Sequence, residues 1–387
     1  MTLHLAVALD GTGWHPAAWR DPAATPEAIF SADYWAALVA EAERGLLDFV
    51  TIEDNLSLQS VLPDRPDDRT DQVRGRFDAV LLAARLAPLT TRIGLVPTGT
   101  TTHTEPFHVA IGIATLDHVS GGRAGWRVRV SPQAQEARHF GRREFPSLDR
   151  LPDGPGGLSS HAEELFAEAT DVVEVARRLW DSWEDDAEIR DVATGRFIDR
   201  DRLHYVDFAG RFFSVRGPSI TPRSPQGQPV VTALAHARLP YEFAAGSADV
   251  VFVTPGSAEE ARAVAGEVRG LSERLMIFAD LVVFLGEGAA GRRARLDELD
   301  GAELSSDAAV FAGTAGELAE LLLEWRRAGI QGFRLRPGTL PYDLERITRD
   351  LTAELRARGA FRSRYEAATL RGLLGLPRPA SRYAEVS

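Results

Sequence analysis

Strand-like and helix-like segments alternate along almost the whole of this chain, and no glycine-rich GxGxxG turn follows the first of them. Eight short apolar runs have the pattern of buried parallel strands, and they span residues 3–9, 47–52, 92–97, 124–130, 229–234, 250–253, 275–285 and 332–335. A doubly wound sheet usually has fewer strands and a glycine-rich dinucleotide turn. The alternation therefore predicts an α/β fold, a (β/α)8 TIM barrel.

Helical periodicity fills the gaps between these runs, as in 31–44, where Ser31 is placed to cap the first turn. Two irregular stretches interrupt the alternation: 145–160 follows the fourth strand, and 186–228 follows the fourth helix. The second is rich in charges, aromatic residues and prolines but has too little apolar periodicity for a core of its own. We therefore expect one domain, 1–387, with insertions at 145–160 and 186–228.

Two residue types are missing, and each absence excludes a class of chemistry. The chain has no cysteine, which excludes thiolate catalysis, disulfides and Cys-ligated metals. All 44 basic residues are arginines, which excludes a P-loop lysine and a lysine Schiff base. The net charge of −12 disfavours binding to nucleic acid.

Membrane attachment is not expected either. The longest apolar run, 275–285, is too short to cross a bilayer and contains Asp280. The first residues lack the basic region of a signal peptide. The chain is expected to be cytoplasmic.

In a barrel of this kind, the active site lies where strands end and helices begin. Residues 98–105 follow the third strand and combine threonine hydroxyls with His103, groups that can hydrogen-bond a ligand. Threonines are also common in loops and helix caps for purely structural reasons. His103 and His108 lack the helical spacing of a metal site, and no other metal motif is present.

Charged residues stand at two further strand ends. Glu53 and Asp54 follow the second strand, and Arg127 and Arg129 alternate within the fourth, so both arginines share one face. Arginines inside a barrel must be paired or must meet an anion, because an unpaired buried charge is very costly. An anionic ligand and internal pairing with Glu53 or Asp54 both satisfy this requirement.

At these residues the sequence resembles the bacterial-luciferase-like flavin monooxygenases, in the branch of nitrilotriacetate, long-chain-alkane and dibenzothiophene-sulfone monooxygenases. The matching stretches run in order across most of the chain: 46–54, 89–95, 105–108, 114–126, 137–141, 179–183, 217–218 and 225–230. The resemblance implies a barrel enzyme that takes reduced FMN from a separate flavin reductase. With O2 it would oxygenate a small organic substrate.

Carried over by position, the resemblance makes Asp54 a contact of the isoalloxazine ring. It places Thr98 and Thr100 on the loop that touches the flavin. His161 takes the place of the histidine that opens the family's fourth helix, shifted by one position, and Phe166 replaces the tyrosine that accompanies it.

The phosphate-binding parts depart further from the family's pattern. The family's asparagine is Arg127 here, and its Gln-Ala-Gly-Ser-Ser loop is Ala-Leu-Ala-His-Ala at 233–237. A phosphate would lose several hydrogen bonds there, each worth about 1.5–3 kcal/mol. Arg127, Arg129 and His236 are the candidates to replace them.

His15 and His103 are the candidates to donate a proton or orient the substrate. Two alternatives stand beside the monooxygenase. One is hydride transfer with the deazaflavin F420, whose longer anionic tail would suit Arg127 and Arg129. The other is a flavin-free barrel that acts as a binding or partner subunit. The helical layer of such a barrel commonly supports dimers, so a homo-oligomer is a further expectation.

Overall fold

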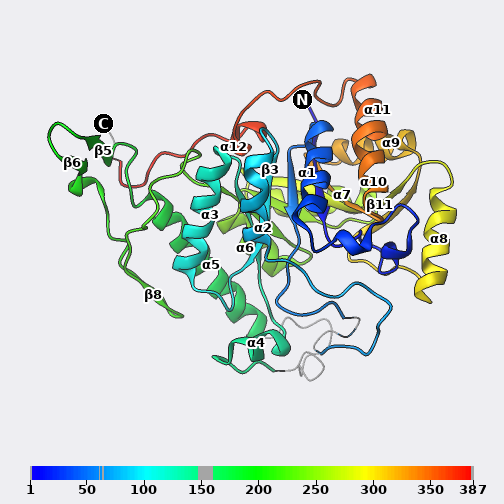
Figure 1. Cartoon of the computed structure of the whole chain (residues 1–387), viewed down its shortest axis with the longest axis horizontal. Helices are drawn as coiled ribbons and strands as arrows, with labels where there is room; N and C mark the ends of the chain where they lie inside the picture. Colours follow the sequence, from blue (N-terminus) through cyan, green and yellow to red (C-terminus); the bar gives the residue numbers. More distant parts are fainter. Residues whose placement is uncertain (1, 61, 63–64, 147–159, 385–387) are drawn as a thin grey trace.

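The computed structural model describes residues 2–60, 62, 65–146 and 160–384, and eight parallel strands close into a barrel at its centre (Figure 1). The barrel strands are β1 (His4–Leu9), β2 (Phe49–Ile52), β3 (Gly94–Thr100), β4 (Gly125–Arg129), β9 (Val230–Leu234), β10 (Val250–Val253), β11 (Met276–Leu285) and β13 (Gly332–Pro337). Each strand pairs with the next, and β13 pairs with β1 to close the ring. The predicted (β/α)8 barrel is confirmed.

Helices follow the strands and form the outer layer (Figure 1). They are α1 (Ala32–Arg44), α2 (Ala79–Leu86), α3 (Pro106–Ser120), α4 (Ala134–Phe140), α5 (Ser160–Asp181), α6 (Arg238–Ser247), α7 (Ala258–Leu271), α8 (Ala289–Asp300), α9 (Ala315–Arg327), α10 (Tyr342–Arg346) and α11 (Thr352–Ala357). The predicted cap is present, since the Ser31 hydroxyl accepts the Tyr34 N–H at 3.3 Å.

One strand of the central sheet was not predicted. β12 (Ala309–Gly313) pairs in parallel with the outer half of β11, from Leu281 to Leu285. The inner half of β11 pairs with β10 as part of the barrel. Because β11 has ten residues, it extends beyond the barrel wall, and α8 and β12 pack on the part that protrudes.

The interior of the barrel is divided into an apolar floor and a polar upper half. Alternate residues of the strands fill the floor with side chains such as Phe49, Val96, Phe252 and Phe278. The short helix α12 (Leu370–Leu373) closes the floor with the fully buried Leu370. Gly94 makes room for it, because a Cβ there would lie 2.6 Å from a Leu370 methyl carbon.

The stretch 186–228 forms two small antiparallel sheets beside the barrel. They consist of β5 (Glu188–Asp191) with β6 (Arg196–Ile198), and β7 (Phe208–Ala209) with β8 (Ser214–Val215). Figure 1 shows β5 and β6 at the far edge of the molecule, where the C-terminal segment ends. Most of 145–160 lies outside the described residues, and the single domain with insertions stays a prediction. No helix in the described ranges has the length and apolar character needed to cross a membrane.

The floor yields a test of stability. Leu370→Ala should lower the free energy of unfolding by about 2–5 kcal/mol, because it leaves a cavity beneath the barrel. Leu58→Ala is the matched control, since that side chain is 55% exposed and its loss should cost about 0.5 kcal/mol or less. Urea unfolding followed by circular dichroism measures both. Equal losses would mean that α12 does not seal the floor.

Candidate active site

A network of buried ion pairs crosses the upper half of the barrel interior. Glu53, directly after β2, forms ion pairs with Arg127 of β4 at 3.0 Å and with Arg334 of β13 at 3.1 Å. Arg334 and Arg336 both form ion pairs with Asp280 of β11. The side chains of Arg334 and Asp280 are fully buried. The strands are thus tied together across the barrel by charge as well as by backbone hydrogen bonds.

Arg336 also pairs with Asp307, so the network holds three guanidinium groups and three carboxylates, and this balance of charge makes burial tolerable. Burial opposes ionisation of Glu53, but the guanidinium groups of Arg127, Arg334 and Arg336 outweigh it and hold the Glu53 pKa below its ordinary value. Burial lowers the pKa of Arg127 to about 10, so its guanidinium stays protonated at neutral pH. Of the two explanations open for Arg127, internal pairing with Glu53 is the one the structure shows.

Arg129 is also paired, though with a residue that the sequence did not single out. Its guanidinium lies 3.2 Å from a carboxylate oxygen of Glu136 in α4. Glu136 is fully buried and also lies within 3.3 Å of the Ser57 hydroxyl. Its only visible signal was its place in α4, five residues after Ser131, which follows β4.

Beside this network, a cavity of about 280 Å³ lies against the loop after β3 and the helices α2 and α3. Asp54, Thr98, Thr100 and Arg129 line it together, so four of the predicted flavin contacts meet there. Asp54 accepts the backbone N–H groups of Asn55 at 2.7 Å and Ala79 at 3.0 Å. Burial raises the Asp54 pKa above its ordinary value.

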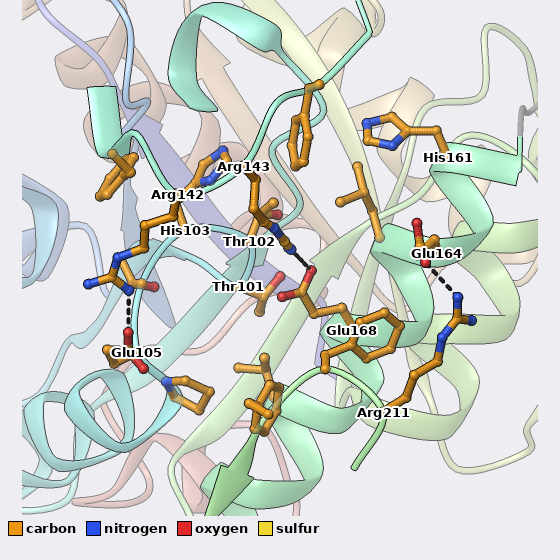
Figure 2. Close-up of a pocket in the computed structure, with 18 of the residues that line it drawn as sticks. Thr101, Thr102, His103, Glu105, Arg142, Arg143, His161, Glu164, Glu168 and Arg211 are labelled. Carbon is orange, nitrogen blue, oxygen red and sulfur yellow. Dashed lines mark hydrogen bonds and ion pairs between the residues drawn. The ribbon is translucent and has the colours of Figure 1, made fainter. Parts of the chain in front are cut away.

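A larger cavity of about 530 Å³ lies on the other side of the same loop, between α4 and α5 (Figure 2). Thr104 borders both cavities. Figure 2 shows His103 and His161 on opposite parts of its wall. His103 stacks on Phe140, with ring centroids 5.0 Å apart, and His161 meets the edge of Phe145 at 4.6 Å.

Both histidines are held in their neutral form. Burial, together with the nearby Arg143 and Arg129, lowers the pKa of His103 to about 4. Burial lowers the pKa of His161 as well, although its ring donates a hydrogen bond to the Pro132 carbonyl. A neutral imidazole has one donor and one acceptor nitrogen. Because the N–H of His161 is used by the Pro132 carbonyl, its unpartnered Nε2 accepts a hydrogen bond from a ligand, whereas the unpartnered Nε2 of His103 donates or accepts according to its tautomer.

The remaining predicted residues lie elsewhere. The His15 ring accepts the Ala17 N–H at 3.0 Å and bonds Asp297 at 3.0 Å, and its side chain is fully buried, so both ring nitrogens serve the structure. His236 bonds the Thr254 hydroxyl at 2.9 Å and lies 3.5 Å from Asp307, at the outer end of the ion-pair network. The structure therefore brings the predicted cofactor contacts to the smaller cavity, the larger cavity and the barrel interior.

Sequence reasoning missed the central members of the network. Asp280 was noted only as a break in an apolar run, and neither Arg334 nor Arg336 was assigned a role, although Arg336 stands at a strand end where an active site is expected. Their alternation in β13 repeats the pattern of Arg127 and Arg129 in β4, and that repeat was the available signal.

The family model described as luciferase-like monooxygenase matches residues 12–332. A relative from Bacillus subtilis (strain 168), named N-acetyl-S-(2-succino)cysteine monooxygenase, is 31% identical over 99% of this chain and 98% of its own length. Nitrilotriacetate monooxygenase component A from Aminobacter aminovorans is 29% identical over 97% of each chain. A solved structure of riboflavin lyase with modified FMN and riboflavin as substrate is similar with a TM-score of 0.83 at 25% identity, over 99% of this chain and 98% of that one.

Breaking the network from its centre should destabilise the fold. Asp280→Asn leaves Arg334 and Arg336 without their shared counter-charge, and a cost of about 3–5 kcal/mol in unfolding free energy is expected. Asp186→Asn removes a 65% exposed carboxylate beside Arg202 and should cost about 1 kcal/mol or less. Chemical denaturation at pH 7 compares the two. A loss for Asp280→Asn as small as the control's would refute the role of this network.

The low pKa of His103 predicts a pH dependence with a definite sign. In the unfolded chain a histidine takes up its proton near pH 6.5, whereas His103 in the folded protein takes it up near pH 4. Stability should therefore fall as the pH drops from about 6.5 to 4. His103→Gln should lose less stability over this range, and NMR titration of the His103 ring should show no proton uptake between pH 8 and 5. A midpoint near 6.5 would contradict the assignment.

Proposed function

This chain belongs to the luciferase-like monooxygenase family, and from that premise we propose that it is the oxygenase of a two-component system. It is an enzyme, and the family implies a flavin cofactor. In the proposal the flavin is FMN, delivered in reduced form by a separate flavin reductase. The reaction transfers one oxygen atom of O2 to a small organic substrate.

The observation that carries the proposal is a set of buried polar atoms with no hydrogen-bond partner among the described residues. Two of them, Arg127 Nε and Ser131 Oγ, belong to β4 and the segment that follows it, and two others, His103 Nε2 and His161 Nε2, belong to residues that line the larger cavity. Leaving such an atom unsatisfied costs about 1–3 kcal/mol. Polar ligands that bond to them would recover this cost, and the ring nitrogens and phosphate of FMN, together with a polar group of the substrate, provide suitable partners.

Several side chains are suited to hold the flavin. Asp54 has two lone pairs beyond those used by Asn55 and Ala79, and these can accept an N–H of the heterocycle. Thr98 and Thr100 place hydroxyls on the same cavity wall. Arg127, Arg129 and Ser131 offer donors to an anionic group, whereas the free nitrogen of His161, expected from the sequence to contact the phosphate, accepts hydrogen bonds and does not fit that role. Because Arg127 and Arg129 also pair with carboxylates, they would orient the anionic group by hydrogen bonds and add little net positive charge to its site.

Reduced FMN, when bound, supplies the two electrons with which one oxygen atom of O2 becomes water while the other enters the substrate. The chain itself must bind and orient the reactants, exclude water and manage protons. His103 is the candidate for proton handling, since its Nε2 is buried, unpartnered and borders the larger cavity. His15 is a weaker candidate because both of its ring nitrogens are engaged.

The two alternatives have less support. Hydride transfer with F420 depended on Arg127 and Arg129 as free partners for an anionic tail, and both are paired with buried carboxylates. A flavin-free barrel leaves the unpartnered atoms without a ligand. Self-association and a cytoplasmic location stay predictions from the sequence.

Titration of the protein with FMN tests the proposal. Reduced FMN, added without oxygen, should bind with micromolar or tighter affinity, and Thr98→Val should weaken it about tenfold by removing one hydroxyl contact. Thr115→Val, on the exposed face of α3, is the matched control and should bind as the parent does. Calorimetry measures all three, with F420 as a parallel ligand. No binding of either FMN form would overturn the proposal.

A further inference from the structure

The larger cavity is lined by four phenylalanines, and this feature indicates what kind of molecule it holds. Phe140, Phe145, Phe212 and Phe213 all contribute to the wall. His103 stacks on Phe140 and His161 on the edge of Phe145, so the two imidazoles extend the aromatic surface. Flat rings favour offset-stacked or edge-to-face contacts with another ring.

Each arginine of the described cavity wall pairs with a glutamate. Arg143 pairs with Glu168 at 2.6 Å, Arg211 pairs with Glu164 at 2.6 Å, and Arg142 pairs with Glu105 (Figure 2). Glu144 adds a fourth carboxylate to the described wall. Three arginines thus face four glutamates, which leaves a formal charge of −1. Among the described residues of the wall, each arginine thus has a glutamate partner and the surplus charge is negative, which disfavours a carboxylate of a ligand.

The two neutral imidazoles are therefore available to recognise a polar group of a ligand. The Nε2 atoms of His103 and His161 are buried without a partner, and only 8% of His103 is exposed. Thr101 and Thr102 add hydroxyl-bearing side chains to the same wall. These groups can hydrogen-bond an uncharged carbonyl, amide or hydroxyl, and they offer no counter-charge to an anion.

We propose that this cavity takes the substrate of the reaction, and that the substrate is an uncharged aromatic or heteroaromatic molecule with one hydrogen-bonding group. The substrate assignment rests on the proposed function, whereas the binding preference rests on the cavity alone. The cavity volume of about 530 Å³ is in the usual range for small-molecule sites, about 300–1,000 Å³. This preference differs from the polycarboxylate named in one relative, nitrilotriacetate.

Binding of two isosteric probes tests the preference without any flavin. 2-Naphthamide and 2-naphthoate share a ring system and differ by one charge at pH 7. Calorimetric titration of the full chain should give tighter binding of the amide, by about tenfold or more, because the carboxylate meets a wall of net negative charge. Propane-1,2,3-tricarboxylate, which has no ring, should not bind measurably.

Variants connect the preference to the proposed residues. Phe145→Leu and Phe212→Leu should each weaken amide binding about fivefold, because they remove an aromatic face. Phe197→Leu is the matched control, since that ring is 64% exposed in β6 and does not line the cavity. Glu164→Gln removes the partner of Arg211, and it should therefore reduce the difference between the affinities for 2-naphthamide and 2-naphthoate.

The outcomes separate this inference from the proposed function. Amide binding that exceeds carboxylate binding and falls in the two cavity variants supports it. Naphthoate binding as tight as naphthamide binding, no binding of either, or equal losses in Phe197→Leu would overturn it. Because these titrations contain no flavin, failure of FMN to bind would count against the proposed function alone.

Discussion

The ion pairs of Arg334 and Arg336 with Asp280 are the interaction on which the polar half of the barrel interior depends. All three side chains are almost fully withdrawn from water, where an isolated charge is very costly. Arg334 gains further from the ring of Phe252, whose centroid lies 4.1 Å away. Arg334 also pairs with Glu53, which pairs with Arg127, and Arg336 also pairs with Asp307, which lies beside His236. Five barrel strands and the segment before β12 are thereby joined at the level where a ligand would bind.

This arrangement explains why the candidate site lies around the loop after β3. The network occupies the upper barrel interior, and two cavities lie beside the loop of residues 98–105. The loop is held in place by local bonds, since the Thr102 N–H donates to the Thr100 hydroxyl and the Thr101 N–H donates to the Arg129 carbonyl at 2.9 Å. The same short segment therefore presents threonines to one cavity and His103 to the other.

The two cavities differ in what they can recognise. The smaller one combines the Asp54 carboxylate with two threonines, a set suited to the polar edge of a heterocycle. The larger one has aromatic walls, self-neutralised ion pairs and two imidazoles kept neutral by burial. The placement of Thr104 at both cavities marks the loop as the boundary between them.

The sequence by itself determined the architecture. Eight apolar runs with helical patterns between them specify the barrel strands, because a strand buried on both faces needs a continuous apolar run. β12 was not predicted although residues 308–312 form a short apolar run, and its residues are only half buried because it pairs with β11 outside the barrel. The sequence also placed Arg127 and Arg129 on one face, since side chains alternate along a strand.

Only the tertiary structure decided their partners. Glu53 is 74 residues from Arg127 in the chain, and the strands β2 and β4 that bring them together are separated by β3, so no local pattern could reveal the pair. The same holds for His15 and His103: both are loop histidines in sequence, but packing against Asp297 engages one, whereas burial beside Phe140 leaves the other with a free ring nitrogen.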